Sequence, residues 1–455
     1  MAARSAASPR RARRWDVLVL GSALPGLAAA VRLAMGGLRV LVAEEQAASR
    51  IPDVLREPFF LPAGPALEGC LRAFGLPPIE RRGLQVDEIA YQVLFPDARL
   101  DVGVPAITTD ELEAWGFVAS AAEAEELMAE LAAAAHLEAE ALLRANFVRA
   151  GAQRPTPAAV SGPRGLPRSL SRAEGRLGDF VSAQLLGLAE DVPGRPSSEA
   201  RARLLGSALG GGASFRKAGA SLRGLLRRRL EALHGELRSL SGPFAITELG
   251  DAPGIARIGH GDAWLGRALL LNAPSARLAA ALRGWKSDVP SFLSKRAARR
   301  RRLSLLLRVK ESEVPEPLAR RALLIPRQGE TGPIRLSRHP SARNGEVELV
   351  LSAVVPDDAK REAEQAAQLV EALGDLLPVL RDRLRPAPPL PRPLWDDEAL
   401  RVESGSHGWP DSVDLRVGGR RPIFRLPREQ MASLGAEGEL LLGWRAGDAI
   451  REELS

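Results

Sequence analysis

The sequence has only one cysteine, Cys70, among its 455 residues. A single cysteine excludes an internal disulfide and every zinc or iron–sulfur site that needs several cysteine ligands. The segment around it, Leu67 to Leu71, has the composition of a short helix, so we expect Cys70 to be a small buried core residue. A reducing, cytoplasmic environment agrees with this cysteine usage.

Histidine is also scarce. None of the five histidines is paired at the spacing of metal ligands, so the sequence predicts no metal site. No combination of Ser, His and Asp, or of Cys and His, indicates an activated nucleophile. These residues are His136, His234, His260, His339 and His407.

The chain lacks an apolar run long enough to span a membrane. The run that starts at Val17 is interrupted at Gly21 and ends at Arg32, short of the about 20 residues that a membrane helix needs. Arginines before this run leave a twin-arginine export signal as an alternative, but we interpret residues 1–14 as a disordered basic leader.

Charge of one sign is only slightly in excess. The 63 Lys and Arg residues against 56 Asp and Glu give a net charge of +7, which over this length does not predict a nucleic-acid partner. Hydrophobic residues make up 45% and charged residues 26%, the balance of a soluble globular protein. The length predicts two structural domains.

A βαβ unit is predicted near the N-terminus. Residues 15–20 form an apolar run of strand length, as in a parallel strand covered on both faces. A turn at 21–26 leads into strong helix formers at 27–34, and Gly36 with Gly37 ends that helix. A second strand follows at 39–43, and Glu44 closes it.

The turn of this unit resembles the phosphate-binding fingerprint Gly-x-Gly-x-x-Gly. Its three positions are Gly21, Ala23 and Gly26, so a methyl group stands where the backbone approaches a pyrophosphate most closely. Ser22 and Leu24 complete the loop, whose free N–H groups favour an anion. Glu44, 23 positions after Gly21, stands where a carboxylate accepts hydrogen bonds from ribose hydroxyls.

With these residues in place, the chain resembles the FAD-dependent oxidoreductases of the phytoene desaturase and flavin amine oxidase superfamily. Four further segments are similar to the family in the right order. They are the Gly-Pro segment and helix at 60–76, the hairpin at 95–102, the helix at 219–230, and the strand, Ala-Pro turn and helix at 268–282.

The resemblance implies an α/β fold with a Rossmann-like FAD/NAD(P)-binding domain built from discontinuous segments and an inserted α+β substrate domain. It implies bound FAD and hydride transfer from substrate to flavin. The expected division is a leader at 1–14, dinucleotide-binding segments at 15–105, 216–285 and 421–455, a helical cap at 106–215, and substrate-domain strands and a helix at 286–420.

The chain departs from the family pattern at two places. After the ribose acid the family has a Gly-Gly-Arg stretch along the pyrophosphate, whereas here Glu45 is followed by a glycine-free segment in which only Arg50 could serve. Near the C-terminus we predict a last strand at 439–443, with Gly443 or Gly447 at the flavin end. The glycine-rich loop that the family places after its last strand is shortened or missing.

Three functions follow as alternatives. The first is an FAD-dependent desaturase or dehydrogenase that acts on an apolar, isoprenoid-like substrate, which the single tyrosine, Tyr91, favours over an amine. The second is a flavin-free binding or structural subunit derived from the same fold. The third is an NAD-binding dehydrogenase.

A basic cluster precedes an apolar strand in the second half of the chain. It forms either a solvated helix face or a contact for anionic lipid or an acidic protein, which would place the protein at the periphery of a membrane. Its members are Lys295, Arg296, Arg299, Arg300, Arg301 and Arg302.

Overall fold

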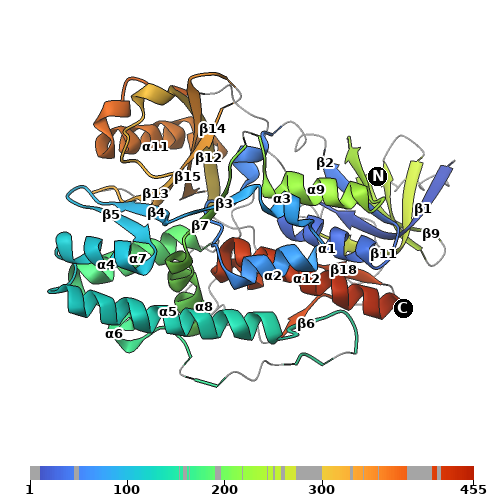
Figure 1. Cartoon of the computed structure of the whole chain (residues 1–455). Coiled ribbons are helices and arrows are strands. Elements are labelled where there is room, and N and C mark those ends of the chain that lie inside the picture. Colours follow the sequence, from blue (N-terminus) through green and yellow to red (C-terminus); the bar gives the residue numbers. More distant parts are fainter. Residues whose placement is uncertain are drawn as a thin grey trace.

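A computed structural model gives the fold (Figure 1). It describes residues 11–45, 51–272 and 300–455, apart from 153, 157–160, 163, 190–195, 218, 243, 250–251, 258–261, 328–331, 342, 357, 387–411 and 418–421.

The first sheet carries the predicted βαβ unit. Strand β1 (Arg11–Leu20) pairs in parallel with β2 (Val40–Glu45) on one side and with β11 (Asp262–Leu271) on the other. The parallel strands β8 (Glu236–Leu240) and β18 (Ile423–Arg425) extend the sheet beyond β2 and β11. Segments from the beginning, middle and end of the chain therefore form one Rossmann-like sheet. A β-hairpin, β9 (Phe244–Leu249) and β10 (Ala252–Arg257), pairs antiparallel with the first half of β11.

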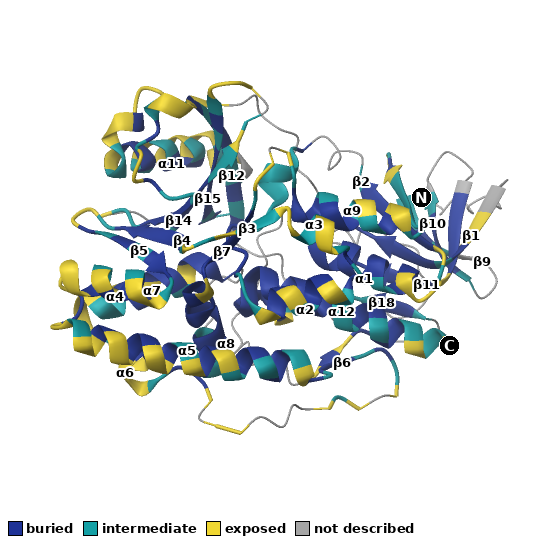
Figure 2. Cartoon of the chain, in the orientation of Figure 1, coloured by how far each residue is buried: buried dark blue, intermediate teal, exposed yellow. Residues whose placement is uncertain are grey.

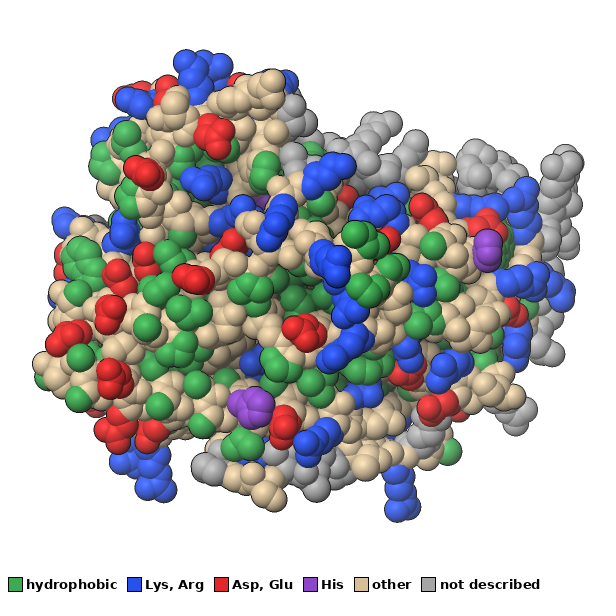
Figure 3. All heavy atoms as spheres, viewed as in Figure 1, with side chains coloured by type: hydrophobic (Ala, Val, Ile, Leu, Met, Phe, Trp, Pro, Cys, Tyr) green, Lys and Arg blue, Asp and Glu red, His purple; other side chains and the backbone are tan. Residues whose placement is uncertain are grey.

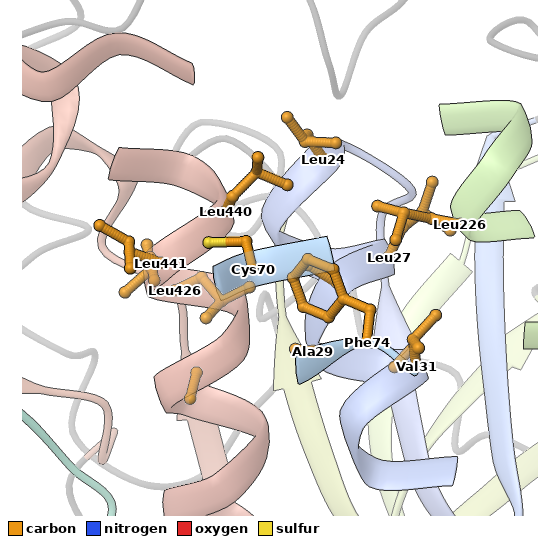
Figure 4. Packing of buried hydrophobic residues seen from close by; sticks show 14 of the residues in the cluster. Leu24, Leu27, Ala29, Val31, Cys70, Phe74, Leu226, Leu426, Leu440 and Leu441 are labelled. Atoms are coloured by element: carbon orange, nitrogen blue, oxygen red, sulfur yellow. The ribbon is translucent and has the colours of Figure 1, made fainter. Parts of the chain in front are cut away.

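Helix α1 (Leu24–Met35) packs at the centre of this domain (Figure 2). Ten of its residues are buried, because helices α9 (Leu222–Ala232) and α12 (Gly435–Leu454) both pack on it. Figure 4 shows apolar side chains of these helices meeting beside Cys70 and Phe74 of α2 (Pro65–Ala73). Cys70 is fully buried, so the expected core role is confirmed.

A second sheet contains most of the strands that were predicted for a substrate domain. Its strand order is β16-β12-β15-β14-β13-β4-β5, and helix α11 (Glu362–Leu376) packs on it. The strands are β4 (Ile89–Leu94), β5 (Arg99–Gly103), β12 (Arg300–Lys310), β13 (Arg321–Leu324), β14 (Ile334–Pro340), β15 (Glu346–Pro356) and β16 (Arg385–Pro386). Strands β4 and β5 fall within the predicted range 15–105, but they pair with this sheet and not with the dinucleotide sheet.

Helices make up most of the range 106–215, which was predicted as a helical cap. They are α4 (Pro105–Ala114), α5 (Ala121–Arg144), α6 (Arg168–Ser171), α7 (Gly175–Leu188) and α8 (Ser198–Gly206). The remaining elements are α3 (Pro78–Arg81), the pair β3 (Leu84–Asp87) and β7 (Gly212–Phe215), the pair β6 (Val148–Arg149) and β17 (Val413–Asp414), and the short turns η2 (Asp53–Arg56), η3 (Ser207–Gly210), η5 (Glu311–Glu313), η6 (Ala359–Arg361), η7 (Pro378–Leu380), η8 (Arg428–Gln430) and η9 (Ala432–Leu434). No helix in the described part of the chain is long and apolar enough to cross a membrane.

Two sequence predictions near the ends of the first domain are corrected. Strand β1 begins at Arg11 and not at Trp15, because the parallel pairing with β11 continues back to that residue; residues 1–10 of the expected leader lie outside the described residues. The predicted strand at 439–443 is part of helix α12. A short apolar run fits a buried strand and a buried helix equally well, and the closing strand is β18.

The expected basic cluster is only partly described. Residues 295–299 lie outside the described residues, and Arg300 to Arg302 begin strand β12, so for these three a helix face is wrong. The Arg301 side chain is mostly buried, and its Nη2 lies 3.2 Å from Glu362 Oε2. Arg301 is therefore not available to a lipid surface in this structure.

Candidate nucleotide site

The phosphate-binding loop has the geometry that its sequence predicts. Gly21 follows β1 with φ +105°, a backbone conformation that favours glycine, and its N–H donates to Ala43 O at 2.9 Å. Helix α1 starts at Leu24, with Ala23 at its N-cap. Ala23 offers no side-chain cap to the first N–H groups of the helix.

Three successive amides of this loop lack an acceptor. In the part of the chain that the structure describes, the backbone N–H groups of Ser22, Ala23 and Leu24 make no hydrogen bond, although the three residues are at most 5% exposed. Buried N–H groups without a partner are rare in folded proteins. Three of them at the start of a helix are the donors that a phosphate group accepts from.

Glu44, the predicted ribose acid, is held by a neighbouring hydroxyl and an arginine. Ser22 Oγ donates to Glu44 Oε1 at 2.5 Å, and Arg56 Nη1 lies 3.0 Å from the same oxygen. The side chains of Glu44 and Arg56 are 2% and 4% exposed, so the ion pair is almost fully shielded from water.

A second arginine reaches this cluster from the other half of the domain. Arg223, on α9, donates to the carbonyl oxygen of Ser22, to Ser22 Oγ at 3.1 Å, and to Glu44 Oε1 at 3.4 Å. Its side chain is 2% exposed. Two arginines of the chain therefore pair with Glu44, the predicted ribose acid.

Asn272 closes the loop from the end of β11. Its Nδ2 donates to Gly21 O and Ala23 O, both at 3.2 Å. A side chain at Gly26 would place its Cβ 2.1 Å from this Nδ2, so glycine is needed here for contact with Asn272. Asn272 Oδ1 is buried and has no hydrogen-bond partner among the described residues.

The other predicted site residues lie elsewhere. Glu45 ends β2 one position beyond Glu44, and Arg50 lies outside the described residues. Gly443 and Gly447 are both inside α12, where an added Cβ would lie 2.5 Å from Ala28 Cβ and from Arg32 Cβ, respectively. These two glycines allow α12 to approach α1 closely, so the structure gives them a packing role.

The connection from β18 to α12 follows the last described strand, where the resemblance implies a glycine-rich loop. It runs from Leu426 to Leu434, contains no glycine, and buries Met431 and Leu434. At the start of α12, Glu437 forms a two-point ion pair with Arg203 of α8 at 2.8 and 2.6 Å. Both side chains are at most 8% exposed.

The two ends of the site differ in how well they fit FAD. At the ADP end the chemistry fits, since three amide donors, a carboxylate and two guanidinium groups are gathered at one loop. Arg56 and Arg223 both contact Glu44 through its Oε1. At the flavin end the connection after β18 contains no glycine, unlike the glycine-rich loop that the resemblance implies.

The sequence patterns did not identify Arg56, Arg223 and Asn272 as residues of this site. Arg56 and Arg223 have no telling sequence context, and Arg223 lies 201 residues from Ser22. Asn272 had a usable signal, because a polar residue directly after a buried parallel strand lies at the carboxyl edge of the sheet, where ligands bind.

Comparisons with known proteins establish the fold. No family model and no curated protein matches the sequence. Among solved structures, an oxidoreductase from Methanosarcina mazei is 14% identical with a TM-score of 0.58, over 95% of this chain and 99% of its own. Wild-type putrescine oxidase bound to putrescine is 15% identical with a TM-score of 0.52, over 97% of this chain and 99% of its own.

The chain thus has the fold of these two solved structures, and the α/β fold with a Rossmann-like sheet that the sequence predicted is confirmed. Sequence identity this low establishes the fold and not an activity. What the chain binds has to be argued from its own residues.

Proposed function

We propose that this protein is an FAD-dependent oxidoreductase whose nucleotide site is the loop between β1 and α1. The three unpaired N–H groups of Ser22, Ala23 and Leu24 carry the proposal. A chain with no anion to bind gains nothing from burying three donors at a helix start, and each costs about 1–3 kcal/mol without an acceptor.

FAD would be held at this cluster by residues of the chain. Glu44 would accept hydrogen bonds from the ribose, and the loop amides would donate to the pyrophosphate. Arg56 and Arg223 lie at the same cluster, and guanidinium groups bind phosphate charges well. The flavin would supply a hydride acceptor, while the protein would supply orientation and a pocket that excludes water.

An apolar, isoprenoid-like substrate is the finer part of the proposal. The observation that favours it over an amine is the position of Tyr91, the single tyrosine. Its hydroxyl donates to Gln184 Oε1 at 2.7 Å, and its ring meets the edge of Phe60 at 5.4 Å. Tyr91 is fully buried and therefore not free to flank a substrate amine.

The visible absorption spectrum of the purified protein tests the proposal. We expect flavin bands, either directly or after the protein is incubated with FAD and excess FAD is removed. Gly21→Trp should abolish retention of FAD because its side chain would fill the phosphate position. Gly37→Ala is the control for backbone strain, since Gly37 also has positive φ, at +80°, with open space around its Cβ position. A protein that shows no flavin bands after excess FAD has been removed contradicts the proposal.

A flavin-free binding or structural subunit is the second candidate. It is favoured by the ion pairs of Arg56 and Arg223 with Glu44, the predicted ribose acid, and by the absence of glycine from the connection before α12. This candidate predicts no retention of FAD by the wild type and no effect of FAD on the melting temperature. Retention of FAD by the wild type but not by Gly21→Trp would exclude it.

A further inference from the structure

A polar cavity lies between the domains that contain the two sheets, and it is separate from the Glu44 cluster. Its volume is about 450 Å³, within the range of small-molecule sites. The segment 51–61, the start of α9, β7 and β14 contribute its walls. None of Ser22, Glu44, Arg56 and Arg223 is among the lining residues.

The acidic side chains of this cavity have partners. Asp53 Oδ2 accepts from Ser221 Oγ at 3.1 Å. Glu57 accepts from the first amides of α9, with Leu222 N at 3.0 Å. Glu348 Oε1 lies 3.6 Å from Arg308 Nε. These three carboxyl groups face five Lys and Arg side chains in the lining, so positive charge is in excess.

The basic side chains fall into two groups. Arg320 and Arg321 share Asp87 as a partner, at 4.0 and 3.6 Å. Lys217, Arg227 and Arg338 line the same cavity, and within the described residues their side chains have no ion-pair or hydrogen-bond partner. Three cations without counter-charges around one cavity make it electropositive.

The behaviour of His339 agrees with an electropositive cavity. Burial, and then the charges of Arg321 and Arg320, lower its pKa to about 4. The imidazole is therefore neutral near pH 7 and adds no charge of its own. Figure 3 shows Lys and Arg side chains gathered on the molecular surface over α3 and α9.

One wall of the cavity is apolar. It includes Ile51, Phe59 and Leu61, each at most 8% exposed, together with Phe215. A bare inorganic anion would satisfy the cations but leave this wall and most of the volume unused. A ligand with an anionic group and an apolar portion would use both.

We propose that this cavity binds a small organic anion, with a phosphate or carboxylate group held by Lys217, Arg227 and Arg338 and an apolar portion against Phe59 and Phe215. The inference goes beyond the proposed function, because it does not require FAD.

Isothermal titration calorimetry on the full chain tests the proposal with four probes. Hexyl phosphate and hexanoate carry the two candidate anionic groups, hexanol has no charge, and inorganic phosphate has no apolar portion. We expect at least one of the two organic anions to bind at least tenfold more tightly than both hexanol and inorganic phosphate. Binding by neither organic anion, or equal binding of hexanol, would overturn the proposal.

Matched variants locate the binding. Arg227→Gln and Arg338→Gln should each weaken the preferred anion about tenfold, the usual effect of losing one charge-assisted contact. Arg228→Gln is the control, because Arg228 is the exposed neighbour of Arg227 on α9 and does not line the cavity. An equal loss in Arg228→Gln would show a non-specific surface effect and overturn the assignment.

Two variants distinguish a failure of the anion-site proposal from a failure of the FAD proposal. Gly21→Trp should lose FAD and keep the anion, whereas Arg338→Gln should keep the FAD spectrum and lose anion affinity. Loss of anion binding in Gly21→Trp, with the fold intact by circular dichroism, would contradict a separate site.

Discussion

Arg223 Nη2 lies 3.1 Å from Ser22 Oγ, joining the start of α9 to the loop between β1 and α1. With Arg56 on the same hydroxyl at 3.2 Å, the two arginines enclose Ser22 and Glu44 in one buried cluster. The stability of the domain and the proposed binding of a nucleotide therefore depend on the same side chains.

Glu44→Gln should destabilise the protein. The change keeps the shape of the side chain but leaves two buried guanidinium groups without their carboxylate, a loss of about 3–5 kcal/mol in the free energy of unfolding. Urea denaturation at pH 7 measures this. Glu113→Gln, on the exposed face of α4, is the control and should change the value by less than about 0.5 kcal/mol. Equal effects of the two changes would contradict the buried cluster.

Arg203→Met should also destabilise the chain by about 3–5 kcal/mol, because Glu437 would keep a buried charge without its partner. The double variant Arg203→Met/Glu437→Leu should recover most of that loss, since no charge is left buried. Thermal unfolding of the three proteins measures both steps. A double variant no more stable than Arg203→Met would show that the pair is not isolated from other polar groups.

The contribution of Glu57 to stability should fall as the pH rises. Burial raises the pKa of this carboxyl from its ordinary 4.5 to about 7, against the opposing effect of the α9 amides. Between these values Glu57 holds a proton in the folded chain that the unfolded chain releases, so this residue's contribution to the free energy of unfolding decreases as pH rises from 4.5 to 7.

The difference between wild type and Glu57→Gln isolates this effect. Urea denaturation at several pH values should show the variant gaining stability relative to wild type across that interval. His339, whose lowered pKa acts in the opposite direction between about 4 and its ordinary 6.5, is present in both proteins and cancels in the difference. A difference that does not change with pH would contradict the shifted pKa.

Gly443→Ala should separate packing from cofactor binding. The added Cβ would lie 2.6 Å from Pro25 O as well as against Ala28, so α1 and α12 must move apart. We expect a loss of about 1–3 kcal/mol by denaturant unfolding, as for other overpacked cores. Gly332→Ala, where a Cβ meets nothing within 4 Å, should be nearly neutral. If Gly443→Ala were as stable as wild type, the contact between these helices would not be tight.

Much of the fold followed from local patterns. The βαβ unit could be predicted because a buried strand, a glycine turn and a run of helix formers each leave a signature within a few residues. The hairpin that the resemblance placed at 95–102 is present as β4 and β5. The run at 439–443 was misassigned because four or five apolar residues do not distinguish a strand from a helix buried on all sides.

The sequence by itself determined the Rossmann-like unit, the position of Glu44 at its end, and the order of segments that resembles the flavoenzymes. Only the tertiary structure decided that Arg56 and Arg223 pair with Glu44, that Gly443 and Gly447 serve helix packing, and that Lys217, Arg227 and Arg338 line one cavity. Secondary structure is encoded by neighbours along the chain, whereas the charge partners of a buried side chain come from segments up to about two hundred residues apart, as Ser22 and Arg223 show with a separation of 201.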